Sequence, residues 1–360
     1  MYLKKYMNFS KESIKQIWQN FSTDKKYILK GTLGSIMIRI VANILSFVST
    51  IVLAHTLGQK VYDDYTYLFT WLSLLGGLSL IGFDNLSLRQ IARYKSQKNY
   101  ALLTGFIIVA TSITSLVGIF AFLFFYITLS LIPDYQSIIT SYLQENLNIE
   151  IYLLAAFMLP FIALTQVYQR LLQGAKHIIR SQIPEMIVRP FILLLLLAII
   201  YFFQGTKLNL QTAIYLQLCA IFIAFLVSIY FFWQKIIKNL PQKISPAYDM
   251  KIWLKASLAF FLLNSISLIN VRADILMLGI MQENTAGISA YNIASRLSEI
   301  PKLILVVTNA TLAPLITTYF VAQKWADLQQ ILTQTARTVL LLSLPCLLYT
   351  SDAADEWLRV

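Results

Sequence analysis

The sequence predicts an all-α integral membrane protein, and its composition, its long apolar runs and the placement of its charges all support that class. Of its 360 residues, 58% are hydrophobic and only 13% are charged, whereas soluble domains carry about a quarter charged residues. A chain this apolar cannot bury its hydrophobic surface in one water-soluble core. The net charge of +12 is spread between the apolar runs, which fits orientation in a membrane and argues against a nucleic-acid partner.

Eight apolar segments are long enough to cross a bilayer, which takes about 20 residues. A ninth begins near Ile331. The eight are residues 32–57, 65–83, 102–132, 151–172, 184–203, 212–233, 253–280 and 286–319. The N-terminus and every second connection are rich in lysine and arginine, whereas the other connections carry only Lys60 and Lys207 beside several acidic residues. The positive-inside rule therefore predicts a cytoplasmic N-terminus.

The charge pattern and the spans divide the chain into five parts. Residues 1–27 form a cytoplasmic N-terminus, either an amphipathic helix on the inner leaflet or a frayed tail. Residues 28–233 form a first six-helix bundle, 234–250 a proline-containing cytoplasmic linker, and 251–345 a partial second bundle. A faint repeat relates "TLGQKVYDDYTYLFTWLSLL" to "MLGIMQENTAGISAYNIASRL", which hints at two related halves. Residues 346–360 are treated separately below.

A polar stripe runs along the first span. Arg39 lies nine residues beyond Lys30, roughly 13 Å into the membrane at 1.5 Å per residue. It shares one helix face with Ser35, Asn43, Ser46 and Thr50. An arginine at that depth suits a water-filled cavity, although a helix–helix contact held by small polar residues would use the same pattern.

The seventh and eighth spans also carry ionisable residues at membrane depth. Asn292, Arg296 and Glu299 share a face at spacings of four and three, which predicts either an anion-favouring site or a self-satisfied ion pair. Arg272 and Asp274 lie two residues apart and point to different faces of the helix. They either belong to a functional site or extend to the outer membrane interface.

Other charged residues have mainly structural interpretations. Glu185 and Arg189 form an i,i+4 pair that would stabilise the start of the fifth span. Asp84 and Arg89 follow the second span, where they would cap and anchor the next helix, as a cytoplasmic anchor or gate. With two histidines, two cysteines and no phosphate-binding loop or catalytic triad, the chain offers no support for an enzyme or a metal site.

An ordered set of segments resembles the bacterial polysaccharide transporters, the oligosaccharide flippases of the multidrug/oligosaccharidyl-lipid/polysaccharide exporter superfamily. The first is "KGTLGSIMIRIVANILSFVSTIVLAHTLG", and the second is "IGFDNLSLRQIARY". "IVRPFILLLL", "RADILMLGI" and "AGISAYNIASRLSEIPKLILVVTNATLAPLI" follow in order. The resemblance covers about residues 28 to 345.

This resemblance implies two six-helix bundles around a central cavity, lined mainly by the spans that hold Arg39, Arg272 and Arg296. The implied substrate is an oligosaccharide on a polyprenyl diphosphate, carried by alternating access for O-antigen, capsule or exopolysaccharide synthesis. Membrane lipids and other polysaccharide-assembly proteins are the implied partners, and H⁺ or Na⁺ the coupling ion. The implied location is the bacterial inner membrane, with no enzymatic activity.

Three other functions stay open at this point. A peptidoglycan-precursor flippase would share the fold and an anionic lipid substrate. A multidrug or cation antiporter of the same superfamily would prefer acidic cavity groups. A membrane-embedded glycan polymerase or glycosyltransferase would need a large polar outer loop, and the longest outer connection, residues 133–150, is small.

The last fifteen residues, "CLLYTSDAADEWLRV", read differently from the rest of the chain. "CLLYTSDAADE" resembles the in-frame translation of a transposase adapter used to build sequencing libraries. The family resemblance implies twelve or more spans, of which about nine are present. We therefore expect a chain truncated in the second bundle, with residues 346–360 an artefact.

Overall fold

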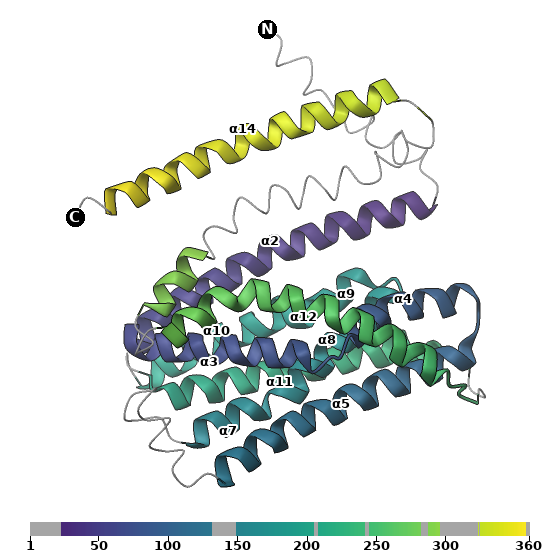
Figure 1. Ribbon diagram of the computed structural model, residues 1–360, viewed down its shortest axis with the longest axis horizontal. Helices are drawn as coiled ribbons and strands as arrows, with labels where there is room; N and C mark the ends of the chain where they lie inside the picture. The colour runs from purple at the N-terminus through teal and green to yellow at the C-terminus, as the bar shows by residue number, and fades with distance from the viewer. Residues whose placement is uncertain are drawn as a thin grey trace. The chain divides into compact units, whose positions relative to one another are not determined.

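The computed structural model describes residues 23–131, 149–204, 208–241, 245–281, 287–295, 323 and 325–357. All regular structure in these residues is helical, with no strand among them (Figure 1), so the all-α prediction is confirmed. The helices are α2 (Thr23–Leu57), α3 (Gln59–Leu78), α4 (Phe83–Ser96), α5 (Tyr100–Leu131), α7 (Ile149–Phe157), α8 (Leu159–Gly174), α9 (Ile178–Ile183), α10 (Arg189–Gln204), α11 (Leu210–Lys235), α12 (Met250–Met281) and α14 (Trp325–Trp357). A π-helical turn, η2 (Pro184–Val188), joins α9 to α10, a 3₁₀ turn, η3 (Ile237–Asn239), follows α11, and residues 288–295 are also helical.

The chain divides into two compact units, one of residues 38–294 and one of the remaining residues, which include α14. The unit of residues 38–294 holds all the contacts described below. Helix α14 contains the predicted start of the ninth span and continues as a helix to Trp357. The division into two bundles at residues 234–250 stays a prediction.

Within the described ranges, six helical segments are long and apolar enough to cross a membrane, which makes this a multi-pass membrane protein. They are Gly34–Leu57, Tyr100–Phe124, Glu150–Gly174, Ile178–Phe202, Leu210–Asn239 and Met250–Gly279. Helices α3 and α4 pass the same test together but meet at a 43° bend. These segments match the first seven predicted spans, whereas most of the eighth lies outside the described residues.

The second span differs from its predicted limits. Helix α3 begins at Gln59, so Lys60, Asp63 and Asp64 belong to its first turns and not to a loop. It ends at Leu78, before the predicted end at Phe83, because the backbone turns into the left-handed region at Ile81 (φ 44°) and Gly82 (φ 74°). A helix cannot continue through two such residues.

Two hydrophobic clusters form the core of the 38–294 unit. One joins the end of α2 to α3, α7, α8, α10 and α11, with Tyr62, Tyr65 and Met158 among its buried members. The other surrounds the α3–α4 bend and includes Phe83, Phe106 and Trp253. Helix α12 enters this second cluster through Trp253, which is fully buried, donates from Nε1 to the Tyr94 hydroxyl at 2.8 Å and lies edge-on to Phe106.

Candidate functional site

Helix α12 packs along α3 and α4, and at three points a glycine lies where an added Cβ would be too close to the neighbouring element. A Cβ added to Gly77 would lie 2.7 Å from Leu268 Cδ1, and one on Gly279 would overlap the Tyr67 ring. At Gly82 an added Cβ would overlap the Ser257 carbonyl oxygen. We call this contact, from Gly279 to Ser257, the α3–α12 seam. Close backbone approach at small residues is how membrane helices associate.

A buried carboxylate closes one end of the seam. Asp63 on α3 is 2% exposed, and its two oxygens accept from the backbone N–H groups of Ser289 at 2.7 Å and Gly287 at 3.3 Å. These N–H groups begin the helix of residues 288–295, which cannot satisfy them internally. A carboxylate at a helix N-terminus also interacts favourably with the helix dipole. Asp63 therefore ties α3 to the segment that follows α12.

The two segments of the faint sequence repeat meet at this end and share a local geometry. Gly58 (φ 74°) precedes α3, and Gly287 (φ 84°) precedes the helix of residues 288–295. Four residues later, Tyr62 and Tyr291 each donate a backbone N–H to the carbonyl of their glycine, both at 3.0 Å. The sequence repeat itself stays a prediction, because its Leu-Gly pairs match Gly58 with Gly279, and Gly279 lies inside α12.

A chain of amide hydrogen bonds closes the other end of the seam. Asn264 on α12 donates from Nδ2 to Asp84 Oδ1 at 2.7 Å, and Asn85 donates from Nδ2 to Asn264 Oδ1 at 2.8 Å. The predicted capping role of Asp84 is wrong, because Gly82 is the N-cap of α4 and makes no side-chain cap bond. The Asp84 carboxylate contacts α12 instead. Arg89, predicted beside it as an anchor or gate, is exposed on α4.

The polar stripe of α2 lies between a buried face of the helix and an exposed apolar face. The face toward the bundle buries Ile38, Ala42, Ser49 and Leu53, and the opposite face exposes Ile40, Ile44, Val48 and Ile51. Arg39 and Asn43 are exposed on the strip between them, where Thr50 donates to its own helix at the Ser46 carbonyl. Arg39 makes no hydrogen bond or ion pair within the described part of the chain. Its guanidinium is therefore available to an anion.

The other predicted site residues divide into three groups. Arg272 is half-buried on the α12 face that carries Leu268 and Asn264, four and eight residues earlier. Asp274 is exposed and accepts from the Tyr291 hydroxyl at 2.9 Å, which joins α12 to the helix carrying the half-buried Asn292. Arg296 and Glu299 lie outside the described residues.

The predicted pair of Glu185 and Arg189 is present, at 2.6 Å between Oε1 and Nη1. Both residues lie at the π-helical turn η2, which widens the helix between α9 and α10. With its amide oxygen turned toward the guanidinium, Gln217 on α11 accepts from Arg189 Nη2 at 2.7 Å and Nε at 3.0 Å. The pair therefore also anchors α10 to α11.

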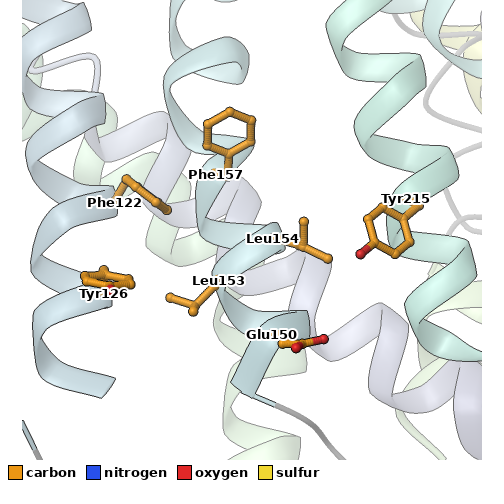
Figure 2. A pocket seen from close by; sticks show the side chains of 7 residues that line it. All are labelled: Phe122, Tyr126, Glu150, Leu153, Leu154, Phe157 and Tyr215. Atoms are coloured by element: carbon orange, nitrogen blue, oxygen red, sulfur yellow. The ribbon is translucent and has the colours of Figure 1, made fainter. Parts of the chain in front are cut away.

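A cavity of about 430 Å³ lies between α5, α7 and α11 (Figure 2), and its described lining includes none of the predicted site residues. In the described part of the chain its lining is aromatic and aliphatic, with one carboxylate: Phe122, Tyr126, Glu150, Leu153, Leu154, Phe157 and Tyr215. A single carboxylate among aromatic rings favours a cation over a diphosphate. This cavity is therefore not the cationic one that the sequence predicts.

Sequence reasoning missed Asp63, Asn85 and Asn264. Asp63 stands beside Lys60 and Asp64, so the local charge predicts a connection between spans and gives no signal of a buried carboxylate. The Asp84–Asn264 bond joins residues 180 apart in the sequence. No local spacing indicates such a contact.

Comparisons with known proteins agree with this architecture. The family described as polysaccharide biosynthesis protein matches residues 28–320, whereas no curated protein matches the chain. An inward-facing multidrug resistance MATE family transporter of the MOP superfamily is similar over 88% of this chain and 72% of its own, with 13% identity and a TM-score of 0.63. An outward-facing one is similar over 90% and 71%, with 15% identity and a TM-score of 0.56.

A MOP superfamily transporter from Pyrococcus furiosus is similar over 89% of this chain and 70% of its own, with 14% identity and a TM-score of 0.51. At these identities the likeness establishes the fold, a MATE-like helical transporter fold. The match over residues 28–320 spans the α2 stripe and the whole α3–α12 seam. The chain thus belongs to the polysaccharide biosynthesis protein family.

Proposed function

We propose that this protein is a flippase that moves a polyprenyl-diphosphate-linked oligosaccharide across the bacterial inner membrane for surface polysaccharide synthesis. The observation that carries the proposal is Arg39, an exposed guanidinium on the polar stripe of a membrane helix that has no partner among the residues the structure describes. An uncompensated cation at that depth is costly unless it meets water or an anion. A diphosphate is the anionic group of the proposed substrate.

The chemistry of Arg39 suits a diphosphate better than a sugar. A guanidinium offers two parallel N–H donors to phosphate oxygens and is weakly hydrated, so it binds phosphate in a poorly hydrated cavity more readily than an ammonium does. Asn43 would donate beside it, one turn further along α2. Arg272, Asp274, Asn292, Arg296 and Glu299 are proposed to complete the cavity from the other bundle.

Transport by alternating access requires the α3–α12 seam to open at each end in turn. The 20 residues of α3 rise about 30 Å, close to the hydrocarbon thickness of a bilayer. The Asp63 cluster and the Asp84 cluster therefore suit gates at opposite membrane surfaces. With a cytoplasmic N-terminus, Asp63 is the outer gate and Asp84, with Arg89 nearby, the inner one.

A multidrug or cation antiporter is the second candidate. The carboxylate of Glu150 among aromatic rings favours it, because such a cavity suits an organic cation. The two functions give opposite results for two variants. Loss of drug resistance in Glu150→Gln with normal transport in Arg39→Ala supports the antiporter, and the reverse pattern supports the flippase.

The test is complementation of a flippase-null bacterial strain, with surface glycan as the readout and membrane level of the protein as the check on expression. We expect Arg39→Ala to abolish glycan display and Arg39→Lys to restore part of it, because lysine keeps the charge but not the bidentate donors. Arg93→Ala, which removes an exposed arginine from the last turn of α4, is the matched control. Normal glycan from Arg39→Ala would refute the cavity role. Complementation of a strain that lacks the peptidoglycan-precursor flippase tests that related function separately.

A further inference from the structure

A cluster of basic side chains forms where the end of α4 meets the connection between α8 and α9. Its members are Lys95, Lys176, His177 and Arg180, and we call it the basic corner. Lys95 Nζ donates to the Ala175 carbonyl at 3.1 Å, which brings the last turn of α4 against the end of α8. Lys176 and Arg180 are exposed, and His177 is half-buried.

The stretches of sequence around the corner carry no acidic residue. Residues 85–133 and 151–184 contain neither aspartate nor glutamate, so the segments that build the corner carry only basic charges. The cations are also close enough to affect one another. The pKa of His177 is lowered, first by burial and then by the charges of Lys95 and Arg180. Like charges held together without an internal counter-ion favour an external anion.

The stabilisation of helix ends accounts for only part of the corner. Cations are favourable near the C-terminus of a helix, and this explains Lys95, which binds a terminal carbonyl. Arg180, however, lies in the first turn of the helical run from Ile178 to Gln204, where the dipole disfavours a cation. The helix dipole therefore does not explain its charge, which fits the basic connections that the positive-inside rule predicts on the cytoplasmic side.

The backbone conformation at the corner is also unusual for the residues it carries. Lys176 has φ 70° and follows α8 at a position where glycine is usual, and His177 N–H closes the turn on the Leu172 carbonyl at 2.8 Å. Lys98, with φ 54°, ends the neighbouring helix α4 in the same way. A lysine is strained in this conformation. Two helices that end side by side thus both place a lysine where glycine would fit better.

The corner lies at the membrane surface. Three residues, 175–177, separate the span Glu150–Gly174 from the span Ile178–Phe202. A connection this short cannot leave the headgroup region. The anions concentrated there are the phosphates of acidic phospholipids.

We propose that the basic corner binds the phosphate of an anionic phospholipid headgroup, with Lys176 and Arg180 as its direct contacts. Arg180 supplies paired N–H donors, and Lys176 a mobile charge. Lys95 and His177 contribute the underlying positive field. The proposal is independent of the transported substrate, because the corner lies on α4, α8 and α9 and includes no residue of the α2 stripe or the α3–α12 seam.

The experiment measures lipid retention by native mass spectrometry on the purified 360-residue chain, with phosphatidylglycerol and phosphatidylcholine as probes. The variants are Lys176→Gly, Arg180→Gln and the pair combined. Glycine suits φ 70°, so Lys176→Gly removes the charge without straining the turn. We expect the combined variant to lose at least tenfold in phosphatidylglycerol affinity, with phosphatidylcholine unchanged and the lipid-free thermal midpoint preserved.

Lys176→Arg, which keeps the charge, should retain the lipid. Lys60→Gln is the control, because it removes one exposed lysine at the start of α3. Three results would overturn the proposal: equal phosphatidylglycerol affinity in the combined variant and the wild type, an equal loss in Lys60→Gln, or displacement of the lipid by millimolar inorganic phosphate. The last would show a small-anion site in place of a lipid site.

Discussion

The buried carboxylate of Asp63 is the residue on which the contact between α3 and the segment after α12 depends. Its partners are backbone N–H groups, so a change of side chain at residues 287 or 289 would leave them in place. The interaction can be removed only from the Asp63 side. This makes Asp63 a clean point for mutation.

We expect Asp63→Ala to lower the free energy of unfolding by about 2 kcal/mol, because it leaves two helix N-terminal N–H groups without an acceptor. Asp63→Asn should cost less, since the amide oxygen still accepts one bond. Thermal unfolding in detergent measures both. Glu150→Ala, which removes an exposed carboxylate, is the control, and a thermal midpoint of Asp63→Ala equal to that of the wild type would contradict the role.

His177 makes the stability of the α8–α9 connection depend on pH. Its pKa in the folded chain lies below the ordinary value of 6.5, first because of burial and then because of Lys95 and Arg180. As pH falls through about 6.5, the unfolded chain takes up a proton more readily than the folded chain, so stability falls. The loss stops growing below the folded-state pKa.

We therefore expect the thermal midpoint of the wild type to fall more between pH 7.5 and pH 5.5 than that of His177→Gln. The substitution removes the titrating group but keeps a polar side chain. Measurements in a neutral detergent avoid the effect of lipid phosphates. An identical pH dependence in the two proteins would show that His177 does not contribute.

At the scale of the element, the bend between α3 and α4 depends on Gly82 for two separate reasons. Its φ of 74° is a conformation that other residues adopt at a cost, and its Cα faces the backbone of α12. Gly58 has the same φ but no neighbouring atom within 4 Å of an added Cβ. The two glycines therefore separate the cost of conformation from the cost of contact.

Gly58→Ala should cost about 1 kcal/mol, the penalty of the left-handed conformation alone. Gly82→Ala should cost at least about 3 kcal/mol more, because its Cβ would overlap the Ser257 carbonyl and lie 2.5 Å from the Phe261 nitrogen. Expression level and thermal midpoint in detergent measure the difference. Equal effects of the two substitutions would mean that α12 does not approach Gly82 this closely.

These elements also show which features of the structure could be predicted from the sequence. Spans such as α5 and α11 were predictable because hydropathy over about 20 residues is a local property, and the Glu185–Arg189 pair because it follows an i,i+4 spacing. The bend at Gly82 was missed because apolar residues continue to Phe83, so hydropathy does not change where the helix ends. The Asn85–Asn264 bond depends on which helices pack together, and no segment of the sequence encodes that alone.

At the scale of the whole molecule, the α3–α12 seam is the feature that a transporter must alter. It is closed by Asp63 at one end and by Asp84, Asn85 and Asn264 at the other. Between these clusters, Gly77 and Leu268 are in direct contact. If the seam separates during the proposed cycle, a covalent bond across it should stop transport.

Two adjacent residues of α3, Gly77 and Gly76, provide positions for a disulfide across the seam and for a control disulfide. A Cβ at position 77 would lie 3.5 Å from Leu268 Cγ on α12, and a Cβ at position 76 would lie 3.7 Å from Ile162 Cβ on α8. The distance at position 76 lies in the Cβ–Cβ range of a disulfide, and at position 268 the leucine Cγ marks approximately where a cysteine sulfur would lie. The pairs are Gly77→Cys with Leu268→Cys, and Gly76→Cys with Ile162→Cys, each in a chain whose Cys219 and Cys346 are replaced by serine.

We expect oxidation of the 77–268 pair to block glycan display in the complemented strain and reduction to restore it, because α3 and α12 belong to opposite bundles in the proposed cycle. The 76–162 pair should form its disulfide without blocking transport, because α3 and α8 lie within one bundle and move together. Non-reducing electrophoresis of a protease-cleaved chain verifies each bond. Full transport with the 77–268 disulfide formed would show that the seam stays closed throughout the cycle, and the gates would then have to lie elsewhere.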